Sequence, residues 1–226
     1  METKQVTVFG GSGLIGGLLI KLLIDDDSFS KIIVVSRSPF KSKSSKVENL
    51  QIDFSNPEEI EHSIKNSSIV FSAIGTTQAN VKGNKIAYRK IDFEITYNIA
   101  KACKIESVKS FLYVSSSGAN SKSSGFYMKL KGEIDAAVSN LNLISTVIFR
   151  PSLLIGKRSE FRFGELIAQF IMPLFAFMFP KNLKPIAAEF VAKAMVYVSK
   201  NPPKGNKIIE NSILIDWKKS LFKEGF

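Results

Sequence analysis

The chain has 226 residues, of which 45% are hydrophobic and 23% charged, with 14 Gly, 8 Pro and one Cys. This composition is typical of a globular protein and excludes a disordered, collagen-like or disulfide-stapled chain. The formal net charge of +11 comes mainly from lysines scattered along the sequence, without a basic block. This scatter argues against nucleic acid binding, although anionic small molecules would still be attracted.

The longest uncharged run, Leu166 to Pro180, has 15 residues with Pro173 inside it. A spanning helix needs about 20 residues, so we expect no transmembrane helix. The aromatic-rich segment 161–179 is expected to cap a substrate pocket or complete the core, with a dimer face or weak contact with a membrane surface as alternatives. The isolated Cys103 fits a reducing compartment, and we expect a cytoplasmic protein that is a monomer or homodimer.

Strand-like and helix-like stretches alternate along the chain. We predict strands at 5–9, 31–36, 50–53, 68–74, 111–115 and 145–149, and helices at about 14–23, from 57 onward, 86–104, 126–139, 164–179 and 187–200. This alternation predicts an α/β fold, a doubly wound parallel sheet with helices on both faces. We expect one domain over 1–226, in which a small helical region from about 151 to 226 completes a substrate pocket.

A glycine-rich turn, GGSGLIG at 10–16, follows the first predicted strand and opens the first predicted helix. Gly10, Gly13 and Gly16 are spaced three apart, and Gly11, Gly13 and Gly16 match G-x-G-x-x-G. Missing side chains permit a tight turn and bring bare backbone and helix N–H groups close to a pyrophosphate. The turn therefore predicts a dinucleotide site in a Rossmann-type sheet; a purely structural turn is the alternative.

The end of the second predicted strand, Ser36-Arg37-Ser38, indicates which dinucleotide binds. From Lys31 to Val47 there is no acidic residue, and Lys41, Lys43 and Lys46 lie close to Arg37 in sequence. A carboxylate here would repel the 2′-phosphate of NADP, whereas a guanidinium can pair with it. We therefore predict NADPH as the cofactor in preference to NADH, unless Arg37 merely decorates an exposed loop.

Two further strand ends belong to the same predicted edge of the sheet. Asp53 follows the third strand and is equally suited to meet the adenine amino group or to cap a turn. Ile74 and Gly75 end the fourth strand, where Gly75 would let the backbone approach a ribose. Ligands of open parallel sheets bind at this edge.

Two Tyr-x-x-x-Lys pairs occur, Tyr97…Lys101 and Tyr127…Lys131, and in each the spacing places both side chains on one helix face. Only the second pair follows a strand that ends in consecutive serines, at 115–117. We therefore predict Tyr127 as acid/base, Lys131 as the cation beside it, and Ser117 or Ser116 as the holder of a substrate oxygen. The first pair is expected to be a surface or packing feature.

With these residues the chain resembles the short-chain dehydrogenase/reductase superfamily, and within it the small atypical NAD(P)-binding group that includes the Tat-interacting protein of 30 kDa. The segments that carry the resemblance are VFGGSGLIGGLL, the Ser36-Arg37 strand end, AIGTTQA at 73–79, VSSSGANSKSSGFYMKLKGEID at 114–135 and FRPSLLIG at 149–156.

The resemblance implies roles for individual positions. Those expected to contact the cofactor are Ser12, Gly13, Leu14 and Ile15 at the pyrophosphate, Arg37 at the 2′-phosphate, Ile74 and Gly75 at the ribose, Pro151 to Leu154 at the nicotinamide, and Arg162. Tyr127 would be the proton donor or acceptor, with Lys131 as its partner. Asp92 stands where many members of the superfamily carry a structural Asn.

These features together predict an NADPH-dependent oxidoreductase that acts on a small carbonyl or alcohol by hydride transfer. One alternative is an NADPH-binding sensor or interaction protein with little turnover. The other is an epimerase or dehydratase that keeps its nucleotide tightly bound.

Overall fold

The computed structural model describes residues 4–156 and 180–221. Its centre is a seven-stranded sheet in the order β3-β2-β1-β4-β5-β6-β9, and every neighbouring pair is parallel. The strands are β1 (Lys4–Phe9), β2 (Phe29–Ser36), β3 (Val47–Gln51), β4 (Ile69–Ser72), β5 (Ser110–Val114), β6 (Ser145–Arg150) and β9 (Gly205–Glu210). This order reverses between β1 and β4, as in the Rossmann fold, and the predicted doubly wound parallel sheet is confirmed.

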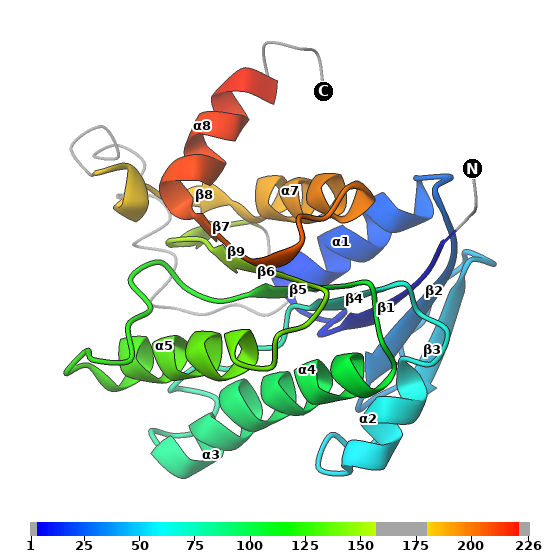
Figure 1. The fold of residues 1–226 in the computed structure, drawn as a ribbon, viewed down its shortest axis with the longest axis horizontal. Helices are drawn as coiled ribbons and strands as arrows, with labels where there is room; N and C mark the ends of the chain where they lie inside the picture. Colours follow the sequence, from blue (N-terminus) through cyan, green and yellow to red (C-terminus); the bar gives the residue numbers. More distant parts are fainter. Residues whose placement is uncertain (1–3, 157–179, 222–226) are drawn as a thin grey trace.

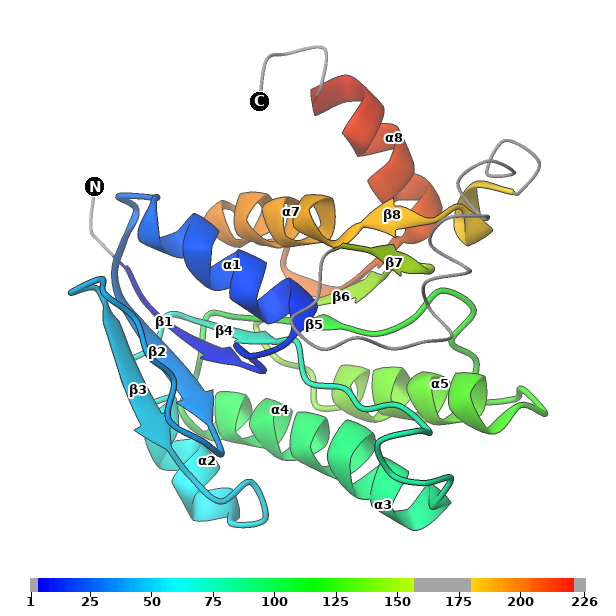
Figure 2. The ribbon, with the colours of Figure 1, turned by 180° about the vertical axis from the view of Figure 1, so that it is seen from behind.

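Helices cover both faces of the sheet (Figure 1). One face carries α1 (Leu14–Ile24) and α7 (Ala188–Lys200), and the other carries α2 (Pro57–Ser63), α4 (Ile95–Ile105) and α5 (Phe126–Ser139), as the reverse view in Figure 2 also shows. The core is accordingly divided into two clusters. Ile32 and Val34 of β2 belong to the cluster on the α1 side, whereas Ile33 and Val35 belong to the other. Burial on both faces explains why β2 lacks polar alternation.

The helix predicted over 86–104 consists of three consecutive pieces. The α-helix α3 (Lys85–Arg89) is followed by a π-helical turn, η1 (Lys90–Glu94), and then by α4. The short α2 begins as the sequence indicates, because the Asn56 side chain accepts the Glu58 N–H and Pro57 occupies the first turn.

Three strands and one α-helix of the described residues were not predicted. They are the edge strand β9, the paired short strands β7 (Leu154–Ile155) and β8 (Ile186–Ala187), and helix α8 (Asn211–Leu221). The sequence of β9, GNKIIE, buries only Ile209, because an edge strand needs little apolar surface, and so it shows no strand pattern. The third strand also begins and ends earlier than predicted, at 47 and 51. The helix predicted at 164–179 lies outside the described residues.

A short 3-10 helix, η3 (Lys181–Leu183), leads into β8. None of the helices in the described ranges has the length and apolar character needed to cross a membrane.

Candidate functional site at the carboxyl edge of the sheet

The glycine turn joins β1 to α1 by a close approach of backbone to backbone. Gly10 has φ of +80°, and the Gly13 N–H donates to the Gly10 carbonyl at 3.0 Å. A Cβ on Gly10 would lie 2.7 Å from the Ala73 carbonyl carbon, and one on Gly16 would lie 2.1 Å from the Gly10 oxygen. Side chains at these two positions would therefore push the turn away from β4 or away from α1.

The first turn of α1 presents its backbone to solvent. Ser12 and Gly13 are exposed, and Gly13, the N-cap, supplies no side-chain hydrogen bond to the helix. The N–H groups that begin α1 are therefore available to an anion, which the helix dipole also favours. Leu14 is half-buried, and the Ile15 side chain lies in the core, so Ile15 can offer only its backbone.

Arg37 directly follows β2 and is exposed together with Ser38. The Gln51 side chain donates to the Arg37 carbonyl at 2.9 Å and holds this strand end, while the Arg37 guanidinium has no ion pair with any described residue. Lys46 does not join it. The Lys46 ammonium donates to the carbonyl of Ile24, the last residue of α1, at 2.9 Å. Lys46 is close to Arg37 in sequence, but its ammonium contacts the end of α1.

Asp53 lies beyond the end of β3 and forms a turn. Its carboxylate accepts the Ser55 N–H at 2.8 Å and the Ser55 hydroxyl at 2.7 Å. These two hydrogen bonds hold the pKa of Asp53 below its ordinary value. In the structure the Asp53 side chain therefore caps a turn, and its contact with the adenine amino group stays a prediction.

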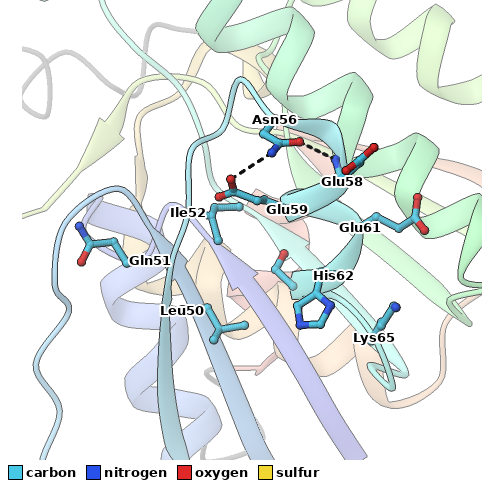
Figure 3. A pocket seen from close by; sticks show the side chains of 10 residues that line it. Leu50, Gln51, Ile52, Asn56, Glu58, Glu59, Glu61, His62 and Lys65 are labelled. Carbon is cyan, nitrogen blue, oxygen red and sulfur yellow. Dashed lines mark hydrogen bonds between the residues drawn. The ribbon is translucent and has the colours of Figure 1, made fainter.

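A hollow of about 560 Å³ lies between β3 and α2 (Figure 3). Several carboxylates line it. That of Glu59 accepts the Asp53 N–H at 2.8 Å and the Asn56 amide at 3.0 Å, so Glu59 stabilises the start of α2. A second hollow, of about 320 Å³, includes Tyr197 of α7 and Trp217 of α8. Neither hollow is lined by the glycine turn or by the predicted Tyr-Lys pair.

Tyr127 and Lys131 lie on the first turns of α5, with Tyr127 half-buried and Lys131 buried. The Lys131 ammonium is 5.9 Å from the centre of the Tyr127 ring and 2.6 Å from Oδ1 of Asp92. Burial would lower the pKa of Lys131, but the Asp92 carboxylate, with smaller contributions from Tyr127 and Asp135, keeps that pKa above the ordinary value. The ammonium is therefore charged and buried beside the phenol.

The sequence analysis did not predict any contact for Asp92. It lies on η1, its side chain is 1% exposed, and it is paired with Lys131 from 39 positions further along the chain. An acidic residue in an otherwise helical stretch, four positions after Tyr88, was the available signal. That signal is weak, since most such carboxylates are on helix surfaces.

The serine loop after β5 is ordered by contacts other than the predicted one. The Ser117 hydroxyl is buried and donates to the Asn182 carbonyl of η3 at 2.7 Å, and the Ser116 hydroxyl points to the Ser117 carbonyl at 3.4 Å. The hydrogen bonds of the described residues include none from either hydroxyl to Tyr127. The structure therefore brings Tyr127 to Lys131 but not to a serine.

A buried network fixes α5 against the sheet. Asp135 accepts the Tyr113 hydroxyl at 2.8 Å and the Ser115 hydroxyl at 3.0 Å, and it pairs with Arg150 at 2.8 Å. Arg150 also pairs with Glu210 of β9 at 2.9 Å. Burial raises the pKa of Asp135, and burial together with Asp135 raises that of Tyr113 well above its ordinary range.

The segment after β6 returns to the glycine turn. Pro151 is buried, Leu154 is half-buried in β7, and a Cβ on Gly156 would lie 2.9 Å from the Leu14 side chain. Gly156, two residues after the predicted nicotinamide segment, therefore lies beside the start of α1. Arg162 lies outside the described residues.

The other Tyr-Lys pair packs on the surface of α4, as expected. The Lys101 ammonium is 5.7 Å from the centre of the Tyr97 ring, and that ring also contacts Phe93.

Comparisons with known proteins assign the chain to a family. A family model described as NAD(P)H-binding matches residues 10–165. Protein FMP52, mitochondrial, of Debaryomyces hansenii is 34% identical over 201 residues, covering 86% of this chain and 87% of the relative. Protein HTATIP2 of Rattus norvegicus is 29% identical over 172 residues, covering 75% and 70%. The FMP52 relatives are named mitochondrial, which contradicts the cytoplasmic location expected from the sequence.

Solved structures share the fold at low sequence identity. UDP-N-acetylglucosamine 4-epimerase from Methanobrevibacter ruminantium has a TM-score of 0.73 at 18% identity, covering 93% of this chain and 77% of that chain. Vestitone reductase from alfalfa has a TM-score of 0.67 at 18% identity, covering 92% and 77%. The chain therefore belongs to the NAD(P)H-binding family, as a Rossmann-fold homologue of the FMP52 proteins and HTATIP2.

Proposed function

We propose that the protein is an NADPH-dependent oxidoreductase that interconverts a carbonyl and an alcohol, with Tyr127 as the acid/base. The observation that carries this proposal is the buried Lys131 ammonium between Tyr127 and Asp92, at the sheet edge that also holds the glycine turn. Ligands of open parallel sheets bind where the strand order reverses, and here it reverses between β1 and β4.

The residues present fit a dinucleotide. The crowding around Gly10 and Gly16 leaves room only for backbone, and the N–H groups of α1 are open to a pyrophosphate. Arg37, which has no ion pair within the described ranges, suits a 2′-phosphate. When bound, the nicotinamide supplies or accepts the hydride. The chain itself handles the proton: in reduction the Tyr127 hydroxyl donates its proton to the forming alkoxide and becomes a phenolate, and in oxidation that phenolate accepts the proton of the alcohol. The ammonium of Lys131 stabilises the phenolate that results.

Calorimetry with NADPH and NADH tests the proposed cofactor binding. Turnover on a panel of aldehydes, ketones and alcohols tests the proposed reaction. We expect NADPH to bind more tightly than NADH, and we expect Tyr127→Phe to retain binding while losing turnover. A protein that binds neither nucleotide would refute the proposal. Equal affinity for both would remove only the preference for NADPH.

A second candidate is an NADPH-binding protein with little turnover. The bond from the Ser117 hydroxyl to the Asn182 carbonyl favours it, because that donor is then occupied by the protein and does not hold a substrate oxygen. Under this reading Tyr127→Phe leaves the cellular function intact, whereas substitution of Gly13 abolishes it.

We also propose a mitochondrial location, which the names of the FMP52 relatives support. Cell fractionation with the full-length tagged chain tests it, and recovery in the cytosolic fraction alone would count against it.

A further inference from the structure

Two buried side chains of the helix before α4 hold the chain just after Gly75. The Tyr88 hydroxyl donates to the Thr76 carbonyl at 2.9 Å, and the Thr76 N–H donates to Oδ2 of Asp92 at 2.8 Å. Both backbone groups of Thr76 are therefore fixed by residues four positions apart, Tyr88 on α3 and Asp92 on η1. Thr76 directly follows the predicted ribose contacts Ile74 and Gly75.

The same two side chains also contact the Tyr127–Lys131 pair. The Tyr88 ring packs edge-on against the Tyr127 ring, with centres 6.2 Å apart and planes at 78°. The Asp92 carboxylate uses its other oxygen, Oδ1, for the ion pair with Lys131. Tyr88 thus contacts Tyr127, and Asp92 contacts Lys131. Asp92 also connects Lys131 to the backbone beside Gly75.

The π-helical turn η1 contains Asp92 and interrupts the helical register between α3 and α4. Such turns are rare and are often found at functional sites. The pair that results is almost fully desolvated, with side chains 1% exposed for Asp92 and 7% for Lys131. Apolar side chains would fill the same space at lower cost, so stability alone does not account for two buried charges here.

We propose that Asp92 is a positioning residue that keeps the Lys131 ammonium charged and in place beside Tyr127, and that ties it to the backbone at Thr76. This inference deepens the proposed function and rests on it, because the ammonium matters for proton transfer and for contact with the cofactor. Asp92 acts through Lys131 and Thr76 and itself need not touch substrate.

The charged groups around Lys131 come from two elements. Tyr127 and Asp135 lie on its own helix, and Asp92 lies on η1. Arg89 of α3 and Glu133 of α5 form a more exposed ion pair, at 2.6 Å. Of the neighbouring carboxylates, Asp92 is the one in direct contact with the ammonium, so its neutralisation should lower the pKa of Lys131 through burial.

The test is an NMR titration of the Lys131 side chain in the full-length protein without nucleotide, with the resonance assigned by its loss in Lys131→Arg. Asp92→Asn keeps an oxygen for the Thr76 N–H but removes the charge. We expect it to lower the titration midpoint of Lys131 by about 1 pH unit or more. Glu133→Gln removes a carboxylate from the same helix as Lys131 and should leave the midpoint unchanged, as should the charge-preserving Asp92→Glu. An unchanged midpoint in Asp92→Asn would overturn the proposal.

Nucleotide binding supplies a second readout. In Asp92→Asn, NADPH affinity should decline as the pH rises through the lowered midpoint, and adding Lys131→Met should abolish that pH dependence. If Asp92→Asn does not fold, the double variant should restore folding by removing the uncompensated ammonium, and its failure to do so would count against the proposal. A wild-type protein that binds no nucleotide would refute the proposed function, while the titration would still decide whether Asp92 holds the charge on Lys131.

Discussion

Two adjacent glycines of α1 have different surroundings and provide a matched pair of substitutions. A Cβ on Gly16 would lie 2.1 Å from the Gly10 oxygen and 2.8 Å from the Gly10 carbonyl carbon. A Cβ on Gly17 would meet only the Gly11 oxygen, at 3.4 Å, which is an ordinary contact. Both residues are inside the helix, so alanine brings the same gain in helix propensity at each, about 1 kcal/mol.

The magnitudes follow from these distances. Gly17→Ala should raise the free energy of unfolding by about 1 kcal/mol and Tm by about 2–4 °C. In Gly16→Ala the new methyl and the Gly10 oxygen must separate by about 1.3 Å, and overpacking of this kind costs about 1–3 kcal/mol. The net effect on stability is a loss of up to about 2 kcal/mol. A shift of this size at the start of α1 would break at least one charge-assisted hydrogen bond to a phosphate, which weakens NADPH binding about tenfold or more.

Differential scanning calorimetry and titration calorimetry with NADPH, applied to both variants, measure the two effects. The distinctive result is opposite signs: Gly17→Ala is more stable than wild type and binds normally, whereas Gly16→Ala is less stable and binds weakly. If the two variants matched each other in Tm and in affinity, the close packing of α1 on the glycine turn would not be what the site requires.

Three further predictions follow from single side chains. Arg37→Ala should weaken NADPH binding about 10- to 100-fold and leave NADH binding and Tm unchanged, because the guanidinium is exposed and unpaired among the described residues; calorimetry with both nucleotides checks this. Tyr113 has a pKa well above its usual range when folded, so above about pH 10 only the unfolded chain releases this proton, and stability falls by up to about 1.4 kcal/mol per pH unit. Urea unfolding between pH 9 and 11 should show that Tyr113→Phe, although about 1–3 kcal/mol less stable near neutrality, lacks this part of the alkaline loss. Burial raises the pKa of the Cys103 thiol, so a maleimide should modify it only after unfolding, and rapid labelling of the native protein would contradict its placement in the core.

The order of most strands and helices could be predicted because the signals are local. Two-sided burial makes β2 a continuous apolar run, and Asn56-Pro57 marks the start of α2 within its own turn. The glycine turn could be located for the same reason, since the glycines that it requires lie close together in the sequence. The edge strand β9 escaped prediction because it buries little, and η1 escaped because one π turn leaves the helical pattern almost unchanged.

By itself the sequence determined the fold class, the position of the glycine turn and the helix that places Tyr127 and Lys131 on one face, all of which depend on residues close together in the chain. Only the tertiary structure decided what those residues contact. It paired Lys131 with Asp92, directed the Ser117 hydroxyl to Asn182, and directed the Lys46 ammonium to the last residue of α1. Each of these contacts depends on how strands and helices distant in sequence pack, and a buried charge or hydroxyl takes whichever partner that packing brings within reach.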